Sequence, residues 1–411
     1  MNKRKIAALL LCIPLIFSGG CSLIDIDQEK ADAMENAKVL AEYKDTDITK
    51  EQVVNYMSQG LSQQGMTLED VESDETYWDS FLQNSISSLV IDQIALEKAT
   101  EFDLDQLTDD ENKEIDDQYN STLDSIKSYA DYIAKAAVED DASKNYDEEY
   151  QNVMNAYFES AGYTQDSLRD EIKKQFIQKK VYDYIIKDIA VTDEDVKTEY
   201  DNQVTIQQGN LKNQPNFVEM QAQLGGRVLV YPDGYMNVRH IFLSFDDETK
   251  SAATTAYGDD KTDEYNKLLG EGKAAVQSKI DDIQSRLDAG EDFAKLMEEY
   301  NEDPTYSSEP ASTEGTEIGP YKSIDNPGYL DAVATLTAAG QVSEPLVNYN
   351  GVYFIQCVKM LAGVVPYDDV KESLTSAMLS GKQQQEWDTV TQGWLDDAKT
   401  AGVLKTYPER Y

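Results

Sequence analysis

The chain has 411 residues, of which 78 are acidic and 36 are basic, and its formal net charge is -42. This acidic balance excludes proteins that hold nucleic acid or anionic lipid headgroups through clusters of Lys and Arg. With one histidine and three cysteines, the chain lacks the usual ligands of a zinc or haem site, so we expect no metal and no cofactor. The length suits two or three domains.

The N-terminus carries the pattern of a secretory signal. Basic residues at 3–5 precede an apolar run over 6–17, which is shorter than the ~20 residues that a membrane-spanning helix needs. Small residues then lead to Cys21, which resembles the lipobox of bacterial lipoproteins. We therefore expect a signal peptide over 1–20, a lipid on Cys21 and a polar tether over 21–38. Because Ser18 replaces the usual leucine, secretion without a lipid is the alternative.

Residues 39–200 contain no proline and follow a helical pattern. Thr49, Thr108 and Thr192 each stand three positions before an acidic or amide residue, which is typical of capped helix N-termini. Apolar residues recur every three or four positions, as at Leu82 and Ile86, which predicts one buried face per helix. We expect a helical domain over 39–200, with packing as the main role of these faces and a peptide-binding groove as the alternative.

Beyond residue 200 the pattern changes. Residues 201–226 are rich in amides and contain Gly209 and Pro215, which favours a linker. Two β-branched runs over 227–231 and 238–243 flank a Pro-Asp-Gly turn, so His240, the only histidine, should lie in a strand. We expect a solvated loop over 246–271, helices over 273–289, 292–300 and 329–336, and a strand over 352–360. This order predicts an α+β domain over 227–363 with a small antiparallel sheet.

Six short blocks in this domain occur in the order that is typical of parvulin-type peptidyl-prolyl isomerases. They are 238–241 (Val-Arg-His-Ile), 290–296 (Gly-Glu-Asp-Phe-Ala-Lys-Leu), 300–303 (Tyr-Asn-Glu-Asp), 317–319 (Glu-Ile-Gly), 340–345 (Gly-Gln-Val-Ser-Glu-Pro) and 350–355 (Asn-Gly-Val-Tyr-Phe-Ile). No single block is specific, but six in this order are. The segment therefore resembles a parvulin domain, with one departure: the family's second histidine is Tyr353 here.

The resemblance implies catalysis of rotation about X-Pro peptide bonds. It assigns seven positions to the site: His240, Asp303 and Tyr353 as catalytic residues, and Ile318, Tyr329, Asn350 and Phe354 as residues that contact the substrate. A tyrosine hydroxyl donates and accepts hydrogen bonds but does not share a proton as an imidazole does, so Tyr353 leaves the activity open. Outside this context, a single histidine in a strand is usually a structural residue.

The helical region is similar to the N-terminal chaperone module that precedes the parvulin domain in SurA-like and PrsA-like secretion foldases. In those proteins a C-terminal helix packs back onto this module, and 364–411 has the matching amphipathic pattern, with Trp387 and Trp394 on one face. The implied fold class is α+β: a mainly helical N-terminal domain completed by a C-terminal helix, with the parvulin-like domain inserted.

The function implied by this resemblance is that of a foldase held by its lipid at the extracytoplasmic face of the cell membrane of a Gram-positive bacterium. It would isomerise X-Pro bonds in newly secreted, unfolded polypeptides. A second interpretation is a holdase chaperone that keeps the fold but has lost catalysis through Tyr353. A third, an unrelated solute-binding lipoprotein, is disfavoured because nothing in the pattern suggests paired α/β lobes. The sequence leaves both a monomer and a homodimer open.

Overall fold

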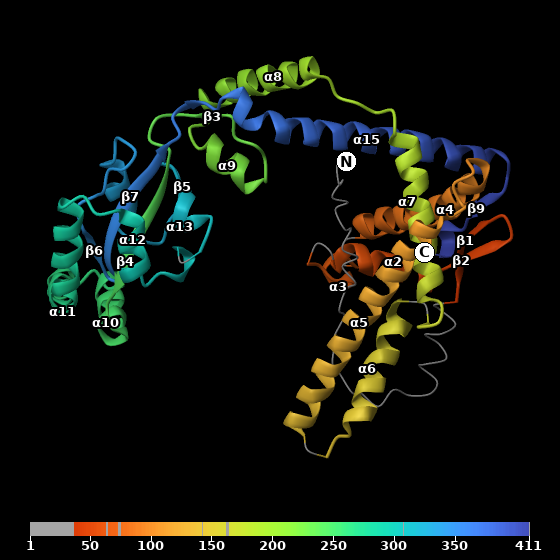
Figure 1. The fold of residues 1–411 in the computed structure, drawn as a ribbon, viewed down its shortest axis with the longest axis horizontal. Helices are drawn as coiled ribbons and strands as arrows, with labels where there is room; N and C mark the ends of the chain where they lie inside the picture. The colour runs from red at the N-terminus through yellow and green to blue at the C-terminus, as the bar shows by residue number, and fades with distance from the viewer. Residues whose placement is uncertain are drawn as a thin grey trace. The chain divides into compact units, whose positions relative to one another are not determined.

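The computed structural model describes residues 37–62, 65–72, 75–141, 143–161, 164–306 and 308–410. They form two compact units, which Figure 1 traces along the chain. The first comprises the described residues up to Ala190 together with those from Leu379 onward, and the second is continuous from Val191 to Met378. The predicted signal peptide, Cys21 and all but the end of the predicted tether lie outside the described residues.

A three-stranded antiparallel sheet joins distant parts of the chain in the first unit. β1 (Val39–Tyr43) lies between β2 (Thr46–Thr49) and β9 (Leu404–Thr406). Ala41 pairs with Ile48 on one side and with Thr406 on the other. The prediction that the chain is helical from residue 39 is wrong for this stretch. Strands this short have too few residues for their period to be distinguished from that of a helix.

Most of the first unit is helical, as predicted. Its helices are α2 (Lys50–Ser62), α3 (Leu68–Glu72), α4 (Glu75–Glu101), α5 (Asp109–Asp140), α6 (Tyr146–Ala161), α7 (Leu168–Ile186) and the later part of α15 (Tyr367–Thr400). The caps predicted at Thr49, Thr108 and Thr192 are all present, each with reciprocal hydrogen bonds to the residue three positions later. Among the helices of the described ranges, none combines the length and apolar character needed to cross a membrane.

Apolar clusters tie α15 into the first unit. One cluster surrounds the sheet, α2 and α4, and Leu395 of α15 is buried in it. Another lies between α4 and α7 around Val181, and Trp387 and Trp394 pack against it. The two indole rings meet edge to face, with 5.7 Å between their centroids. The later part of α15 thus belongs to the core of this unit.

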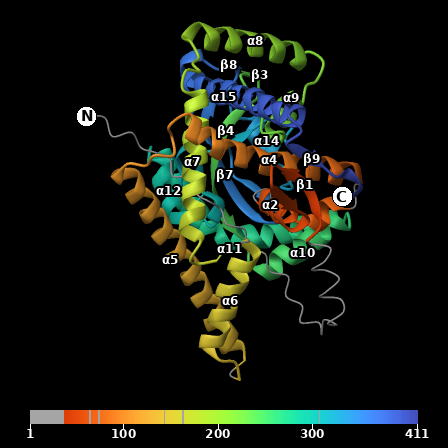
Figure 2. The same ribbon diagram turned by 90° about the vertical axis from the view of Figure 1, so that its right-hand side faces the viewer.

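α5 and α6 form a helical hairpin and run side by side in Figures 1 and 2. Ile115, Leu123 and Ile126 of α5 share an apolar cluster with Met154 and Phe158 of α6. Leu168 and Ile172 of α7 belong to the same cluster, so it packs the hairpin against α7.

The second unit contains a four-stranded antiparallel sheet of order β5-β4-β7-β6, and β3 pairs separately with β8. The strands are β3 (Val230–Tyr231), β4 (Met236–Ser244), β5 (Thr316–Ile318), β6 (Leu346–Asn348), β7 (Gly351–Met360) and β8 (Gly363–Val364). The helices are α8 (Asp193–Leu211), α9 (Phe217–Gln223), α10 (Asp247–Gly258), α11 (Thr262–Asp288), α12 (Phe293–Tyr300), α13 (Ala311–Glu314) and α14 (Tyr329–Ala334), with a 3-10 turn, η1 (Pro304–Tyr306). The predicted α+β class with small antiparallel sheets is confirmed.

The expected linker over 201–226 is instead mostly helical, formed by the end of α8 and by α9. Pro215 lies in the turn between these helices and does not interrupt either of them. The buried Gln207 explains part of the amide content, because its side chain donates to the carbonyl of Arg227 and accepts from the N–H of Leu229. An amide side chain that hydrogen-bonds to two buried backbone groups has a structural role, and composition alone does not reveal that role.

The loop expected over 246–271 is also helical. It contains α10 and the first turns of α11, which lie side by side in Figures 1 and 2. Asp246 caps α10 by accepting from the N–H of Thr249, and only small residues, Ala253 and Ala256, are buried along the helix. A helix that buries alanine shows almost no apolar period, so its acidic surface led to the wrong prediction.

The two central strands divide the side chains of the second unit between two faces of the sheet. β4 and β7 are antiparallel, with His240 opposite Ile355 and Phe242 opposite Tyr353. Because neighbouring residues of a strand point to opposite faces, Ile241 lies in the cluster under α11 and α12, whereas Val238 faces the cluster next to α14. His240 shares the face of Val238, which determines its surroundings.

Candidate functional site

His240 lies in the middle of β4 and is 5% exposed. Both imidazole nitrogens have partners: Nε2 lies 3.0 Å from Oδ2 of Asp303, and Nδ1 lies 2.9 Å from the hydroxyl of Tyr329. Asp303 follows α12, and Tyr329 begins α14. Three segments that are distant in sequence therefore meet at one ring.

Asp303 is held in place by its own turn. Its N–H donates to Oδ1 of Asn301 at 3.2 Å, and its Oδ1 accepts from the N–H of Thr305 at 2.8 Å. Asn301 in turn accepts from the N–H of Phe242 on β4 at 3.0 Å, which attaches the turn to the sheet. The hydrogen bond with His240 is the main cause that lowers the pKa of Asp303 to about 2, and the N–H of Thr305 adds to it.

The contact with Asp303 shows that Nε2 of His240 carries a proton. Asp303 is a carboxylate at neutral pH, so it can only accept, and an N–H must be on Nε2. Nδ1 pairs with the hydroxyl of Tyr329, which can either donate or accept. Both imidazole nitrogens are thus engaged within the protein.

Three tyrosine rings surround the imidazole. The centroids of Tyr306, Tyr353 and Tyr329 lie 4.3, 5.2 and 5.7 Å from that of His240, and Tyr353 stands perpendicular to it. Burial raises the pKa of Tyr353 to about 12 and that of Tyr329 well above its usual value. Both hydroxyls therefore keep their protons at neutral pH and remain hydrogen-bond donors.

Two asparagines act on the hydroxyl of Tyr353. The side chains of Asn326, from the loop before α14, and Asn350, from the turn before β7, oppose the rise in its pKa. Asn348 fixes this arrangement, because its Nδ2 donates to Asn326 Oδ1 and, at 3.0 Å, to the carbonyl of Pro327. Tyr353 thus has a polar environment of its own beside the imidazole.

The structure brings six of the seven residues assigned to the site together. His240, Asp303 and Tyr353 converge, Ile318 and Tyr329 lie in the same apolar cluster as Tyr353, and Asn350 reaches its hydroxyl. The seventh, Phe354, is fully buried on the opposite face of the sheet beside Ile241, so its prediction as a substrate contact is wrong. Adjacent residues of one strand, such as Tyr353 and Phe354, do not face the same side.

Two further residues beside His240 and Tyr353 have no signal in the sequence. Tyr306, which is 7% exposed, comes from the 3-10 turn after Asp303 and lies nearest to the imidazole ring. Asn326 lies in the loop before Tyr329, and only its spacing from Tyr329 in the sequence indicates its position. Neither belongs to a periodic element, so no pattern signal was available for them.

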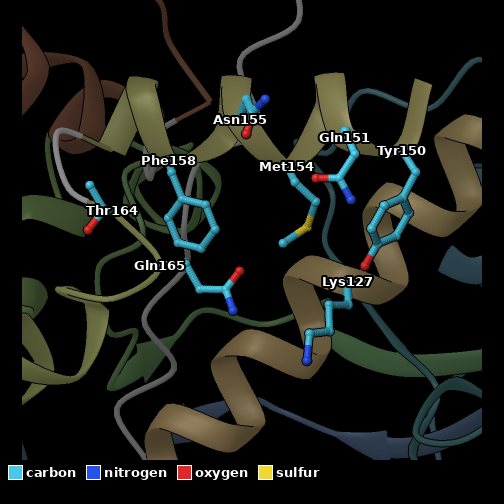
Figure 3. Close-up of a pocket in the computed structure, with 8 residues that line it drawn as sticks. All are labelled: Lys127, Tyr150, Gln151, Met154, Asn155, Phe158, Thr164 and Gln165. Carbon is cyan, nitrogen blue, oxygen red and sulfur yellow. The ribbon is translucent and has the colours of Figure 1, made fainter. Parts of the chain in front are cut away.

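Elsewhere, a groove of about 550 Å³ lies along the α5–α6 hairpin of the first unit (Figure 3). Tyr150, Met154 and Phe158 extend from α6 toward it, and Lys127 extends from α5. Its lining mixes aromatic, thioether and amide groups, and Lys127 and Tyr150 are its titratable members. Across the described ranges, no group of three His, Cys, Asp or Glu side chains is placed to hold a metal ion.

Comparisons with known proteins bear on the whole chain. No protein-family model matches it. A protein of Clostridium botulinum named foldase protein PrsA is 24% identical over 409 residues, covering 98% of this chain and 97% of that protein. The protein of the same name from Clostridium acetobutylicum is 23% identical, covering 97% and 96%.

Among solved structures, one described as a SurA-like chaperone of Campylobacter jejuni is 12% identical, covers 88% of this chain and 96% of its own, and has a TM-score of 0.29. The similarity in sequence to the two clostridial proteins extends through both units. The chain is therefore similar over almost its whole length to proteins named foldase protein PrsA, which confirms the predicted resemblance to PrsA-like foldases.

Proposed function

We propose that this chain is an extracytoplasmic foldase that isomerises X-Pro peptide bonds in unfolded polypeptides. The similarity to proteins named foldase protein PrsA supports the general assignment. The observation that carries the catalytic part is the network of Asp303, His240 and Tyr329, with Tyr353 against the imidazole, on one face of the sheet.

The reaction needs no nucleophile and no metal. Rotation of the peptide bond is opposed by a barrier of ~18–20 kcal/mol, which arises from amide resonance. A catalyst must bind the twisted amide more tightly than the planar one, and each ~1.4 kcal/mol of that preference accelerates rotation tenfold. Oriented hydrogen-bond donors in an apolar setting provide such a preference, because they act on the charge distribution of the twisted amide.

The residues around His240 supply these elements. The ionised Asp303 orients the imidazole through its Nε2, and Nδ1 orients the hydroxyl of Tyr329. Tyr353 holds a second protonated hydroxyl beside it. Ile318 belongs to the apolar cluster that contains both tyrosine rings, so the donors lie in a low-dielectric setting.

The test is cis-to-trans isomerisation of X-Pro peptides by the full-length chain. We expect catalysis by the wild type, a loss of at least about tenfold with His240→Ala, and a gain with Tyr353→His. Tyr353→Phe tests the hydroxyl alone, because it removes that group and keeps the ring. Tyr321→Phe is the control, because Tyr321 is exposed and outside the network. An inactive wild type would contradict the proposal. Catalysis by His240→Ala at the wild-type rate would show that His240 takes no part in the reaction.

A non-catalytic holdase is the second candidate, and one observation favours it. His240, Tyr329 and Tyr353 are each only 4–5% exposed, and both nitrogens of His240 already have hydrogen-bond partners within the protein. The groove in the α5–α6 hairpin gives such a chaperone an apolar and amide-lined surface for an unfolded chain. Aggregation of an unfolded client protein without prolines distinguishes the two functions. A holdase suppresses this aggregation, whereas an isomerase without chaperone activity does not.

The location follows from the N-terminal pattern rather than from the folded units. We propose that the chain is anchored outside the cytoplasmic membrane by a lipid on Cys21. Incorporation of a labelled fatty acid in cells, compared between the wild type and Cys21→Ser, tests this. Label in the wild type only is the expected result, and secretion of an unlabelled chain would contradict the anchor.

A further inference from the structure

The unforeseen helix α10 carries an aromatic surface beside the candidate site. Tyr257, near its end, contacts Tyr265 of α11 with 5.3 Å between ring centroids and Tyr349 of the β6–β7 turn with 5.5 Å. Tyr257 is 49% exposed, whereas Tyr349 is 9% exposed beneath it. We call these three residues the tyrosine platform. Its accessible part is mainly the ring of Tyr257.

The platform is continuous with the residues around His240. The hydroxyl of Tyr349 donates to Oδ1 of Asp325 at 3.2 Å. The next residue, Asn326, and Asn350, which follows Tyr349, both act on the pKa of the Tyr353 hydroxyl. The loop before α14 and the turn before β7 therefore connect the platform to the surroundings of Tyr353.

The charge around the platform is negative. Asp260 is exposed in the turn between α10 and α11, Asp263 is exposed in the first turn of α11, and Asp325 is exposed beside Tyr349. The lysines of the same segment do not offset them, because Lys250 pairs with Asp247 at 2.9 Å and Lys261 pairs with Asp259 at 3.0 Å. An aromatic face with unneutralised carboxylates at its rim is complementary to a cation.

From this geometry we infer that the tyrosine platform and Asp325 form a flanking subsite that accepts an Arg or Lys side chain next to the client's proline. The inference rests on the proposed isomerase function and specifies which clients it favours. A cation within ~6 Å of a tyrosine ring is attracted by its π face. Arg should be preferred to Lys, because its planar guanidinium stacks on the ring while its N–H groups reach the carboxylate of Asp325.

The experiment compares X-Pro peptides that differ only in one residue near the proline: Arg, Lys, norleucine or Glu. The isomerisation rate constant kcat/KM is measured for each peptide with the full-length chain at low and high salt. We expect Arg and Lys peptides to exceed the norleucine peptide by about two- to fivefold and the Glu peptide to fall below it. High salt should shrink this ratio, since the carboxylates at the rim are exposed.

Variants assign the effect to the platform. Tyr257→Ala and Asp325→Asn should each bring the ratio of Arg to norleucine peptides toward one, whereas Tyr257→Phe should retain most of it because phenylalanine keeps the aromatic face. Tyr321→Ala is the matched control, because Tyr321 is 53% exposed but outside the platform, and it should leave the ratio unchanged.

The outcomes separate this inference from the proposed function. If the wild type isomerises none of the peptides, the proposed function fails and the subsite fails with it. If it isomerises all of them equally, or prefers norleucine at every salt concentration, only the subsite is refuted. A preference for Arg that survives Tyr257→Ala would also overturn the assignment.

Discussion

Replacing Asp303 with asparagine should destabilise the second unit by about 2 kcal/mol at neutral pH. The carboxylate accepts from His240 and from the N–H of Thr305, and these bonds lower its pKa from 3.8 to about 2. A shift of this size favours the ionised folded state by roughly 2 kcal/mol. Asparagine keeps the shape and an accepting oxygen but lacks the charge that strengthens both bonds.

The pH dependence has a definite sign. Because the pKa in the folded state lies below that of the unfolded chain, the contribution of Asp303 is complete above about pH 4 and disappears as the pH falls toward 2. About half of it should be lost by pH 3. The difference in unfolding free energy between wild type and Asp303→Asn should therefore be large at pH 7 and smaller at pH 3.

The assay is urea unfolding followed by two probes. All three tryptophans, Trp78, Trp387 and Trp394, lie in the first unit, so their fluorescence reports its unfolding alone. The imidazole signal of the single histidine, observed by NMR, reports the second unit. Asp303→Asn should shift the second transition and leave the first in place, and the exposed Asp233→Asn should shift neither. Equal effects of Asp303→Asn at pH 7 and pH 3 would refute the reasoning.

Three further predictions use the same probes. Desolvation and the nearby Glu171 raise the pKa of the half-buried Asp92 in α4 to about 6. Asp92→Asn should therefore stabilise the first unit by roughly 1–3 kcal/mol at pH 7 and by little below pH 4, as measured by urea unfolding with tryptophan fluorescence. In ¹⁵N NMR at neutral pH, the imidazole of His240 should show a protonated Nε2, and an unprotonated Nε2 would contradict the hydrogen bond to Asp303. Gly315 has φ +75°, and a Cβ there would lie 2.6 Å from the carbonyl oxygen of Val238, so Gly315→Ala should cost the second unit at least ~2 kcal/mol. Gly340→Ala, at φ +83° but in open space, should cost about half as much in the same urea titration.

The sequence predicted the residues of the candidate site better than it predicted the elements around them. Six blocks in a fixed order located His240, Asp303 and Tyr353, because short motifs record positions where residue type and spacing are both constrained. Phe354 was misassigned since a motif does not state which face of a strand each residue occupies. Tyr306 escaped because the 3-10 turn that presents it is too short to have a pattern.

The elements that were missed share a physical cause. α10 buries alanines and β1 has only five residues, so neither shows the apolar period on which recognition of helices and strands depends. The end of α8 was hidden by amides, among which Gln207 is buried with both of its polar atoms paired to backbone groups. Tertiary contacts of this kind are decided by partners far away in the chain and leave no local signal.

The pairing of β1 with β9 bears on the order in which the chain assembles. These two neighbouring strands lie near opposite ends of the chain: the ammonium of Lys405 contacts Glu42, which lies 363 residues earlier. A chain that emerges N-terminus first during synthesis can complete the continuous unit 191–378 while the sheet still lacks its last strand. The compact unit then shortens the loop that β1 and β9 must close, which lowers the entropic cost of closing it. The helical unit should therefore mature last, and removal of residues 404–410 should leave a nascent protein whose second unit is folded and whose first unit stays open to proteases.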